Sequence, residues 1–259
     1  MTEIDQALRT FARQIPEEVK SYSVMDMARA KGYHAAAQRI ESMHAGMLFW
    51  ILRLQNTMKD LPSPPIDGLT SEENDLKSRI VKDAVCRGRR SGIHRHMPDA
   101  PCEVRKSPIH GLGVFATRDV PAFTYLTMYP TDGLKWAPIG VKTNHVAWGW
   151  LGETKFDGEQ YALAVPEPKG AEFLTILGDP SQKDNPHFLG HLINDGARCK
   201  SLKASAVYEC VSLAKCNAIF CPVVRAVFSI KSIEKGQEIL IHYGAQYWVC
   251  LSLLQQESE

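Results

Sequence analysis

The chain lacks an apolar stretch long enough to span a membrane. Its longest such stretch, around Gly46 to Leu52, is far shorter than the about 20 residues that a bilayer requires. Residues 1–5 also lack the basic region and the apolar core of a secretion signal. We therefore expect a protein without membrane contact that works inside the cell, in the nucleus or the cytoplasm.

An excess of charge is missing too. Lysine and arginine together number 30 and aspartate and glutamate 29, so no overall field attracts nucleic acid or anionic lipid. Nucleic acid is therefore an unexpected partner. One local exception is the basic segment Arg87–His96. It could contact nucleic acid or act as a nuclear signal, but it is better interpreted as a solvated connector.

Metal-ligand patterns are absent as well. The seven cysteines are odd in number, irregularly spaced and never arranged as Cys-x-x-Cys, which argues against a structural zinc site. No group of His, Asp or Glu residues shows ligand spacing, so a metal hydrolase is the least favoured function class. We expect no metal, and reduced thiols as in most intracellular proteins.

Residues 1 to about 90 show helical patterns. A helix over 24–30 stops at Gly32, a second begins near Tyr33, and a third covers about 70–86. Steps of three and four place an apolar stripe along the second helix, made of Ala36, Ile40, Met43, Met47, Ile51, Leu54 and Met58. Such a stripe is typical of a core surface or of a surface that binds a partner helix, so a protein partner could bind through these helices.

The segment Asp26–Ile40 resembles the helix pair of an ankyrin repeat. Only one such unit is visible, and isolated repeats are not stable. Two interpretations stay open. Either these helices are the end of a repeat array, or they form a helical hairpin that packs on the following domain.

From Cys102 onwards, short β-rich runs alternate with turn residues and helical patterns are few. The runs cover 102–106, 113–116, 125–128, 160–165, 218–226 and 238–243. The sequence therefore predicts an α+β fold. Its expected parts are a helical region over 1–90, a basic linker over 91–101, a mostly-β domain over 102–248 and a C-terminal tail over 249–259.

Three segments of the β-rich region carry motifs. The first, Ser107–Arg118, holds a Gly-x-Gly turn at Gly111 and Gly113, followed by a Val-Phe-Ala strand. Glycine lets main-chain groups approach a bound cofactor closely because it has no Cβ. The second, His191–Gly196, reads His-Leu-Ile-Asn-Asp-Gly, which alone would be an ordinary turn.

The third segment begins at Cys216 and leads to a final strand that ends in Tyr243-Gly244, followed by an aromatic pair. In this order, the three segments resemble the motifs of SET-domain protein lysine methyltransferases. The resemblance runs from about Cys102 to Trp248, more than half of the chain. The third segment matches the family most strongly.

The resemblance implies a mostly-β SET domain of small sheets, with a C-terminal segment threaded under a neighbouring loop as a pseudoknot. It implies S-adenosyl-L-methionine as the cofactor and a lysine of a histone or another protein as the methyl acceptor. Tyr243 matches the catalytic tyrosine. Cofactor contacts are expected at His110, Gly111, Leu112, Gly113, His191, Asn194, Asp195 and Tyr243. The substrate channel is expected at Ile241, Tyr247 and Trp248, although the last two could equally pack the C-terminus on the sheet.

The chemistry gives Tyr243 a positioning role. Methyl transfer from a sulfonium to an amine is an in-line displacement, so alignment and desolvation do most of the work. A phenol at its ordinary pKa is a poor base, whereas a narrow apolar channel favours the neutral amine. Five residues depart from the family pattern. Ile241 replaces an aromatic residue and His242 an acidic residue, while His191, Asp195 and Gly196 replace an arginine, a histidine and a serine.

These departures keep two rivals open beside the methyltransferase. A catalytically weak or inactive SET-like module could recruit partners through its helices. Alternatively, an ankyrin-type scaffold could use the SET region only structurally. We favour the enzyme because three separate segments match the family in the right order.

Overall fold

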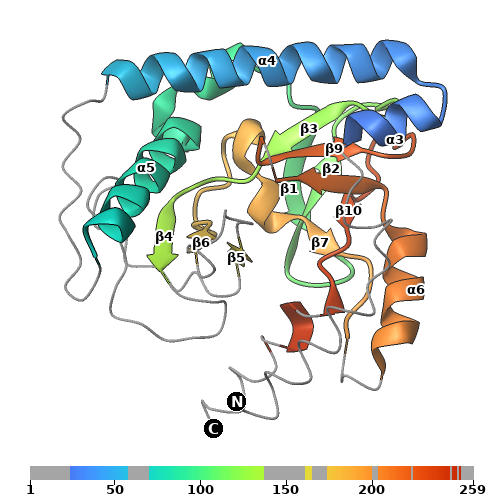
Figure 1. Ribbon diagram of the computed structural model, residues 1–259. Coiled ribbons are helices and arrows are strands. Elements are labelled where there is room, and N and C mark those ends of the chain that lie inside the picture. The colour runs from blue at the N-terminus through green and yellow to red at the C-terminus, as the bar shows by residue number, and fades with distance from the viewer. Residues whose placement is uncertain are drawn as a thin grey trace, which may run out of the picture.

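The computed structural model describes residues 24–57, 70–136, 161–164, 174–199, 204–222, 224–245, 247–249 and 251. Long helices lie beside several small sheets, which confirms the predicted α+β class (Figure 1). Helix α4 runs along one side of the molecule, and the strands gather beneath it. Within the described residues, no helix is both long and apolar enough to cross a bilayer.

Three helices open the described chain, as predicted. They are α3 (Val24–Ala30), α4 (His34–Thr57) and α5 (Ser71–Arg87). The predicted stripe of α4 faces the core, where Ala36, Ile40, Met47 and Ile51 are buried and Met43 and Leu54 pack against them. Met58 lies outside the described residues. With 24 residues, α4 is long for one helix of a two-helix repeat of about 33 residues, and the ankyrin resemblance remains a prediction.

The strands form four small sheets in the part of the chain that is described. β1 (Cys102–Lys106) pairs antiparallel with β2 (Leu112–Ala116). A second sheet has the order β3 (Tyr125–Met128), β9 (Ala226–Ser229), β8 (Ala218–Cys221), and a third the order β4 (Gly133–Trp136), β6 (Leu174–Leu177), β5 (Ala162–Ala164). The fourth is a parallel pair of β7 (Asn194–Asp195) and β10 (Leu240–Ile241).

Helix α6 (Ser205–Lys215) and four short 3₁₀ turns complete the described structure. The turns are η1 (Arg89–Ser91), η2 (Ile93–His96), η4 (Pro186–Phe188) and η5 (Gly190–Leu192). Strands β4 and β6 and helix α6 were not among the predicted elements. Figure 1 shows α6 at the edge of the molecule beside the strand pair of β7 and β10.

Two predicted strands differ from those observed. The run over 218–226 is two strands, because the chain turns after Cys221 and Arg225 has a φ of 53°, in the left-handed region. The run over 238–243 forms only the two-residue β10, while Glu238 makes an isolated bridge with Phe115. Both predictions were therefore wrong in extent.

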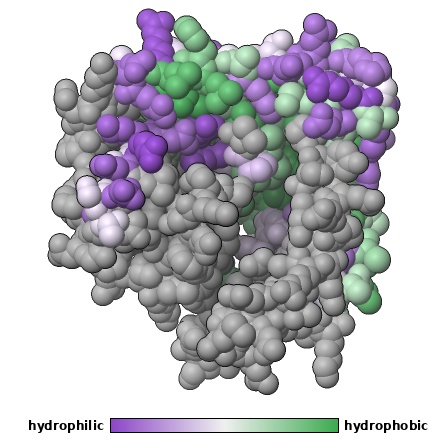
Figure 2. Space-filling model, viewed as in Figure 1, coloured by the Kyte–Doolittle hydropathy of each residue, from purple (hydrophilic) through white to green (hydrophobic). Residues whose placement is uncertain are grey.

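Helix α4 shares a hydrophobic core with strands of two sheets. This core joins Ile40 and Met47 of α4 with Val114 of β2 and Phe228 of β9. The helical hairpin thus packs on the following domain, in agreement with the second of the two interpretations. The exposed side of α4 carries Leu48, Phe49 and Leu52, and Figure 2 shows an apolar area over this helix.

The basic segment after α5 is packed as well. Ile93 is fully buried, and the Arg89 guanidinium donates to both carboxylate oxygens of Asp132, at 2.8 and 3.2 Å. Its interpretation as a solvated connector is therefore wrong. The division into 1–90, 91–101, 102–248 and 249–259 remains a prediction.

Neighbouring residues of α4 provide a test of this packing. Ile51 is 3% exposed and Leu52 is 60% exposed. We expect Ile51→Ala to lower the free energy of unfolding by about 2–5 kcal/mol because it leaves a cavity in the shared core. Leu52→Ala, the matched control, should change it by less than about 0.5 kcal/mol. Urea denaturation measures both, and equal effects would contradict the orientation of α4.

Candidate active site

Segments far apart in the sequence line one cavity of about 280 Å³. Of the predicted cofactor contacts, all but Gly113 line it: His110, Gly111, Leu112, His191, Asn194, Asp195 and Tyr243. Two predicted channel residues, Tyr247 and Trp248, line it too. Ile241 does not, and packs against the main core instead. Sequence reasoning did not select the remaining lining residues, which are Ile109, Tyr161, Leu192, Ala197, Arg198 and Leu251.

The parallel pairing of β7 and β10 explains why these segments meet. Leu240 lies opposite Asn194 and Ile241 opposite Asp195, so Tyr243 follows directly beyond the paired residues. The same late segment also bonds to β2, since the Ile239 amide donates to the Val114 carbonyl at 2.8 Å. It therefore runs between segments that occur much earlier in the chain. The predicted pseudoknot agrees with this course and remains a prediction.

The side chain of Asn217 makes the hydrogen bonds that a partner strand would otherwise make along this segment. Its Nδ2 donates to the Glu238 carbonyl at 2.8 Å, and its Oδ1 accepts from the Leu240 backbone amide at 2.9 Å. Asn217 is 3% exposed, so both bonds are shielded from water. The short β10 is thereby held on both sides.

Tyr243 is fixed at both ends of the residue. Its hydroxyl donates to the Ile193 carbonyl, and its backbone amide donates to Asp195 Oδ2 at 3.1 Å. The ring stacks on Trp248 at a centroid distance of 5.7 Å and meets Tyr247 edge-on at 4.7 Å. Burial, and next the nearby Tyr247, hold the pKa of Tyr243 well above its usual value. The phenol is therefore neutral and cannot act as a base near neutral pH.

Asp195 is the most heavily bonded side chain of the site. Its Oδ1 accepts from the Ala197 amide at 3.0 Å and from the Ser212 hydroxyl at 2.5 Å. Its Oδ2 accepts from the Tyr208 hydroxyl, from the Tyr243 amide, and from Trp248 Nε1 at 3.2 Å. Since Asp195 is only 3% exposed, this carboxylate is occupied in holding the site together.

Asn194 anchors the glycine-containing turn. Its side-chain nitrogen lies 3.2 Å from the His110 carbonyl, 3.0 Å from the Leu112 carbonyl and 2.9 Å from Glu238 Oε1. Glu238 also accepts from the Ser107 hydroxyl at 3.0 Å. Sequence reasoning did not select Glu238 as a site residue, although its position within the third segment was noted.

The two glycines of the turn have different roles. Gly111 has a φ of 48°, which glycine adopts without strain. A Cβ on Gly113 would overlap the Glu238 carboxylate and approach the Asn194 amide. Gly113 therefore makes room for this contact within the protein, and its predicted contact with a cofactor remains a prediction.

His191 is buried, and only one of its two ring nitrogens makes a hydrogen bond among the described residues. Its Nε2 donates to the Asp179 carbonyl at 3.0 Å, while Nδ1 has no hydrogen-bond partner among the described atoms. Burial, reinforced by the nearby Arg89 charge, lowers the pKa of His191 to about 3. The imidazole is therefore neutral, and its buried Nδ1 is an acceptor without a partner among the described atoms.

His242 lies behind the cavity, with α6. Its Nδ1 is 2.8 Å from the Ser212 hydroxyl, its Nε2 is 2.8 Å from Glu209 Oε2, and its ring stacks on Tyr208. It does not line the cavity. Two departures from the family pattern, Asp195 and His242, thus meet in one network through Ser212 and Tyr208.

A comparison with protein-family models finds no match for the chain, and a comparison with curated proteins finds none either. Among solved structures, the chain is similar to a Plasmodium falciparum protein provisionally named a histone methyltransferase. That similarity has 16% identity, covers 58% of this chain and 99% of the other, and has a TM-score of 0.29. The ATXR5 SET domain in complex with a dimethylated histone H3 is similar at 15% identity, 79% and 95% coverage, and a TM-score of 0.34.

No group of three or more His, Cys, Asp or Glu residues suited to a metal ion is found in the described part of the chain.

Replacing Gly113 tests the contact of Glu238 with the turn. We expect Gly113→Ala to lower the free energy of unfolding by about 1–3 kcal/mol, because the added methyl group displaces the carboxylate. Glu238→Ala removes the obstacle, so the double variant should lose less than the sum of the single losses. Gly46→Ala in α4 is the control, with open space around its Cβ, and should not destabilise. Strict additivity in the Gly113–Glu238 cycle would contradict the contact.

The buried His191 makes stability depend on pH. The pKa of His191 is about 3 in the folded state and about 6.5 in the unfolded state, so below pH 6.5 the unfolded state binds the proton more readily. The contribution of the neutral His191 to the free energy of unfolding is therefore complete above pH 6.5 and is lost as the pH falls towards 3. At pH 5 the loss amounts to about 2 kcal/mol. Urea unfolding measures the difference in the free energy of unfolding between pH 5 and pH 8. In His191→Gln this difference should be smaller than in the unmodified chain by about the same amount. An unchanged difference would contradict the neutral buried state of His191.

Proposed function

We propose that the chain is an S-adenosyl-L-methionine-dependent protein-lysine N-methyltransferase. One observation carries the proposal. Tyr243, the segment Asn194–Asp195 and the turn His110–Leu112 line a single cavity, although they lie far apart in the sequence. The resemblance of the three sequence segments to SET-domain methyltransferases assigns these same residues to cofactor and catalysis.

The character of the cavity suits the proposed cofactor. Its volume of about 280 Å³ lies just below the range of about 300–1,000 Å³ for ligand sites. Tyr243, Tyr247 and Trp248 give it an aromatic wall, which attracts cations such as a sulfonium. The turn His110–Leu112 and the side chain of Asn194 would hold the polar parts of the cofactor, and His191 would form part of the wall around it. When bound, S-adenosyl-L-methionine supplies an electrophilic methyl group.

Tyr243 would position the reacting groups. Its hydroxyl is tied to the Ile193 carbonyl and stays protonated, so it presents a fixed dipole to the cavity. A free lysine is almost entirely charged at neutral pH, because its pKa is about 10.4. The aromatic wall would lower that pKa by excluding water, which raises the fraction of the reactive neutral amine.

The proposed substrate is a lysine side chain of a histone or another protein. Tyr247 and Trp248 would form the channel that admits it, since both lie against Tyr243. Methylation of histones would place the protein in the nucleus, and other substrates in the nucleus or the cytoplasm. The exposed apolar residues of α4 leave a surface for the protein partner expected at the N-terminal helices.

The rival, an inactive SET-like binding module, also has an observation in its favour. The nitrogen of Asn194 and the carboxylate of Asp195 are both engaged within the protein. A ligand would have to compete with these internal hydrogen bonds to contact either group. Calorimetry with S-adenosyl-L-methionine separates the two functions, because the inactive module is expected to bind no cofactor.

Tyr243→Phe tests the enzyme directly. We expect turnover with a labelled methyl donor to fall by about 10²-fold or more, because the hydroxyl that orients the reactants is lost. The assay should use a panel of histones and a cell lysate, with mass spectrometry to locate the product. Tyr33→Phe is the control, since Tyr33 is 48% exposed and is not among the residues that line the cavity. Full activity of Tyr243→Phe would reject the role of this residue.

A further inference from the structure

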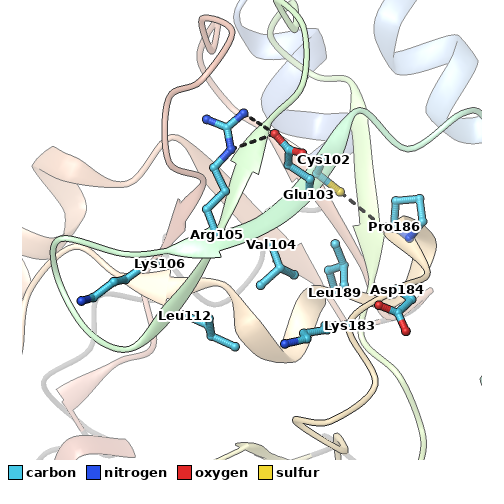
Figure 3. Close-up of a pocket in the computed structure, with 10 residues that line it drawn as sticks. All are labelled: Cys102, Glu103, Val104, Arg105, Lys106, Leu112, Lys183, Asp184, Pro186 and Leu189. Atoms are coloured by element: carbon cyan, nitrogen blue, oxygen red, sulfur yellow. Dashed lines mark hydrogen bonds and ion pairs between the residues drawn. The ribbon is translucent and has the colours of Figure 1, made fainter.

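A second cavity, of about 500 Å³, lies on the outer side of the β1–β2 hairpin (Figure 3). All five residues of β1 line it, together with Leu112 of β2. The opposite wall is formed by Lys183, Asp184, Pro186 and Leu189. Leu112 is the one lining residue shared with the candidate active site among those described, so the two cavities are distinct.

This cavity follows the backbone edge of β1. Successive residues of a strand point to opposite faces, so a cavity on one face would be lined by every second residue. Instead, all of Cys102–Lys106 line it. In the described part of the chain β1 has β2 as its partner strand and none on the other side. The cavity therefore lies along an open strand edge.

The register shows which backbone groups face this edge. The Ser107 amide donates to the Gly111 carbonyl at 2.9 Å, and the Thr117 amide donates to the Pro101 carbonyl at 3.0 Å. Hydrogen-bonded pairs alternate along an antiparallel ladder, so Glu103 and Arg105 also bond towards β2. Val104 and Lys106 then direct their N–H and C=O groups outward. No backbone partner on that side is found within the described residues.

The side chains give the cavity an apolar floor and a basic rim. Val104 and Leu112 of the hairpin and Leu189 of the opposite wall supply apolar surface (Figure 3). Glu103 and Arg105 form an ion pair with each other, so their charges cancel. Lys106 and Lys183 make no ion pair within the described residues, which leaves two cations against the single carboxylate of Asp184.

We propose that the outer edge of β1 binds an extended acidic peptide segment of a partner protein by strand addition. Main-chain bonds to Val104 and Lys106 would supply affinity, as in other cases in which a peptide extends a sheet. Since the side chains of Val104 and Lys106 point to the same face of β1, one face of the peptide would meet both of them. On that face, an aliphatic side chain would meet the apolar floor opposite Val104, and an acidic side chain two positions along would meet Lys106 and Lys183. A lysine-rich segment would be repelled, so this surface does not suit the substrate of the proposed methyltransferase, and the proposal does not depend on that function.

The first test uses designed peptides and the full chain. A fluorescein-labelled peptide of about ten residues should bind saturably in an anisotropy titration, if one face carries valine and aspartate in turn and the other face carries serine. The same peptide with lysine in place of aspartate should bind at least about 10-fold more weakly. N-methylation of the amides along one edge of the peptide should weaken binding by about 10-fold relative to the unmodified peptide. No binding, or equal binding of all these peptides, overturns the proposal.

The second test uses variants of the chain. Val104→Pro removes the outward N–H without removing a bond to β2, and should weaken binding by about 10-fold or more. Val104→Ala is the matched control, because it trims the side chain and keeps the amide. Lys106→Glu combined with Lys183→Glu should reverse the preference between the acidic and the basic peptide. These surface changes decide the question even if Val104→Pro fails to fold. Unchanged binding in the lysine variant overturns the proposal.

Two further outcomes would assign the edge to another occupant. Sedimentation of the chain alone would show a dimer, lost in Val104→Pro, if a second copy pairs along β1. Single-stranded DNA would displace the acidic peptide as well as unlabelled peptide does, if the rim binds any polyanion. Either result overturns the proposal of a peptide partner. A monomeric chain whose peptide is displaced by unlabelled peptide alone supports it.

Discussion

The buried carboxylate of Asp195 is the constraint on which the candidate site depends. It accepts from the loop after β7, from Tyr208 and Ser212 of α6, and from Tyr243 and Trp248 near the end of the chain. A buried charge costs several kcal/mol unless its lone pairs are satisfied. The donors must therefore be in place when the charge is buried. One polar group thus fixes the relative positions of three separate segments, with a directionality that apolar packing lacks.

The late segment of the chain needs this help because its own strand is short. β10 contributes two paired residues, which alone would give little stability. On one side of this segment, the Asn217 side chain hydrogen-bonds the Glu238 carbonyl and the Leu240 amide. On the other side, the Glu238 carboxylate accepts from the Ser107 hydroxyl and the Asn194 side-chain nitrogen. Side chains here do the work of a strand partner. Such bonds specify one register, whereas a longer strand could slip.

The sequence allowed the strands and the site to be predicted to different degrees. β1 and β3 have the predicted bounds because alternation and turn residues are local signals. Tyr243 and Asn194 were brought together by the motif resemblance, since no local pattern relates residues so far apart. Helix α6 was missed because its exposed side carries Val207 and Val211, so no polar stripe marks its period. Because α6 was not predicted, Tyr208 and Ser212 were not predicted as partners of Asp195. The structural role of Asp195 could therefore not be inferred from the sequence.

The β1–β2 hairpin separates the two cavities and contributes to both. The turn His110–Leu112 faces the candidate active site, and the outer edge of β1 faces the other cavity. Within the hairpin, Lys106 pairs with Leu112 and Arg105 with Gly113, whose space is filled by Glu238. A ligand on the outer edge can change the turn only if it binds two arrangements of the hairpin with different affinity. The contacts of Glu238 and Asn194 oppose a second arrangement, because moving Gly113 would break them together. The hairpin therefore acts as a rigid wall between two separate binding surfaces.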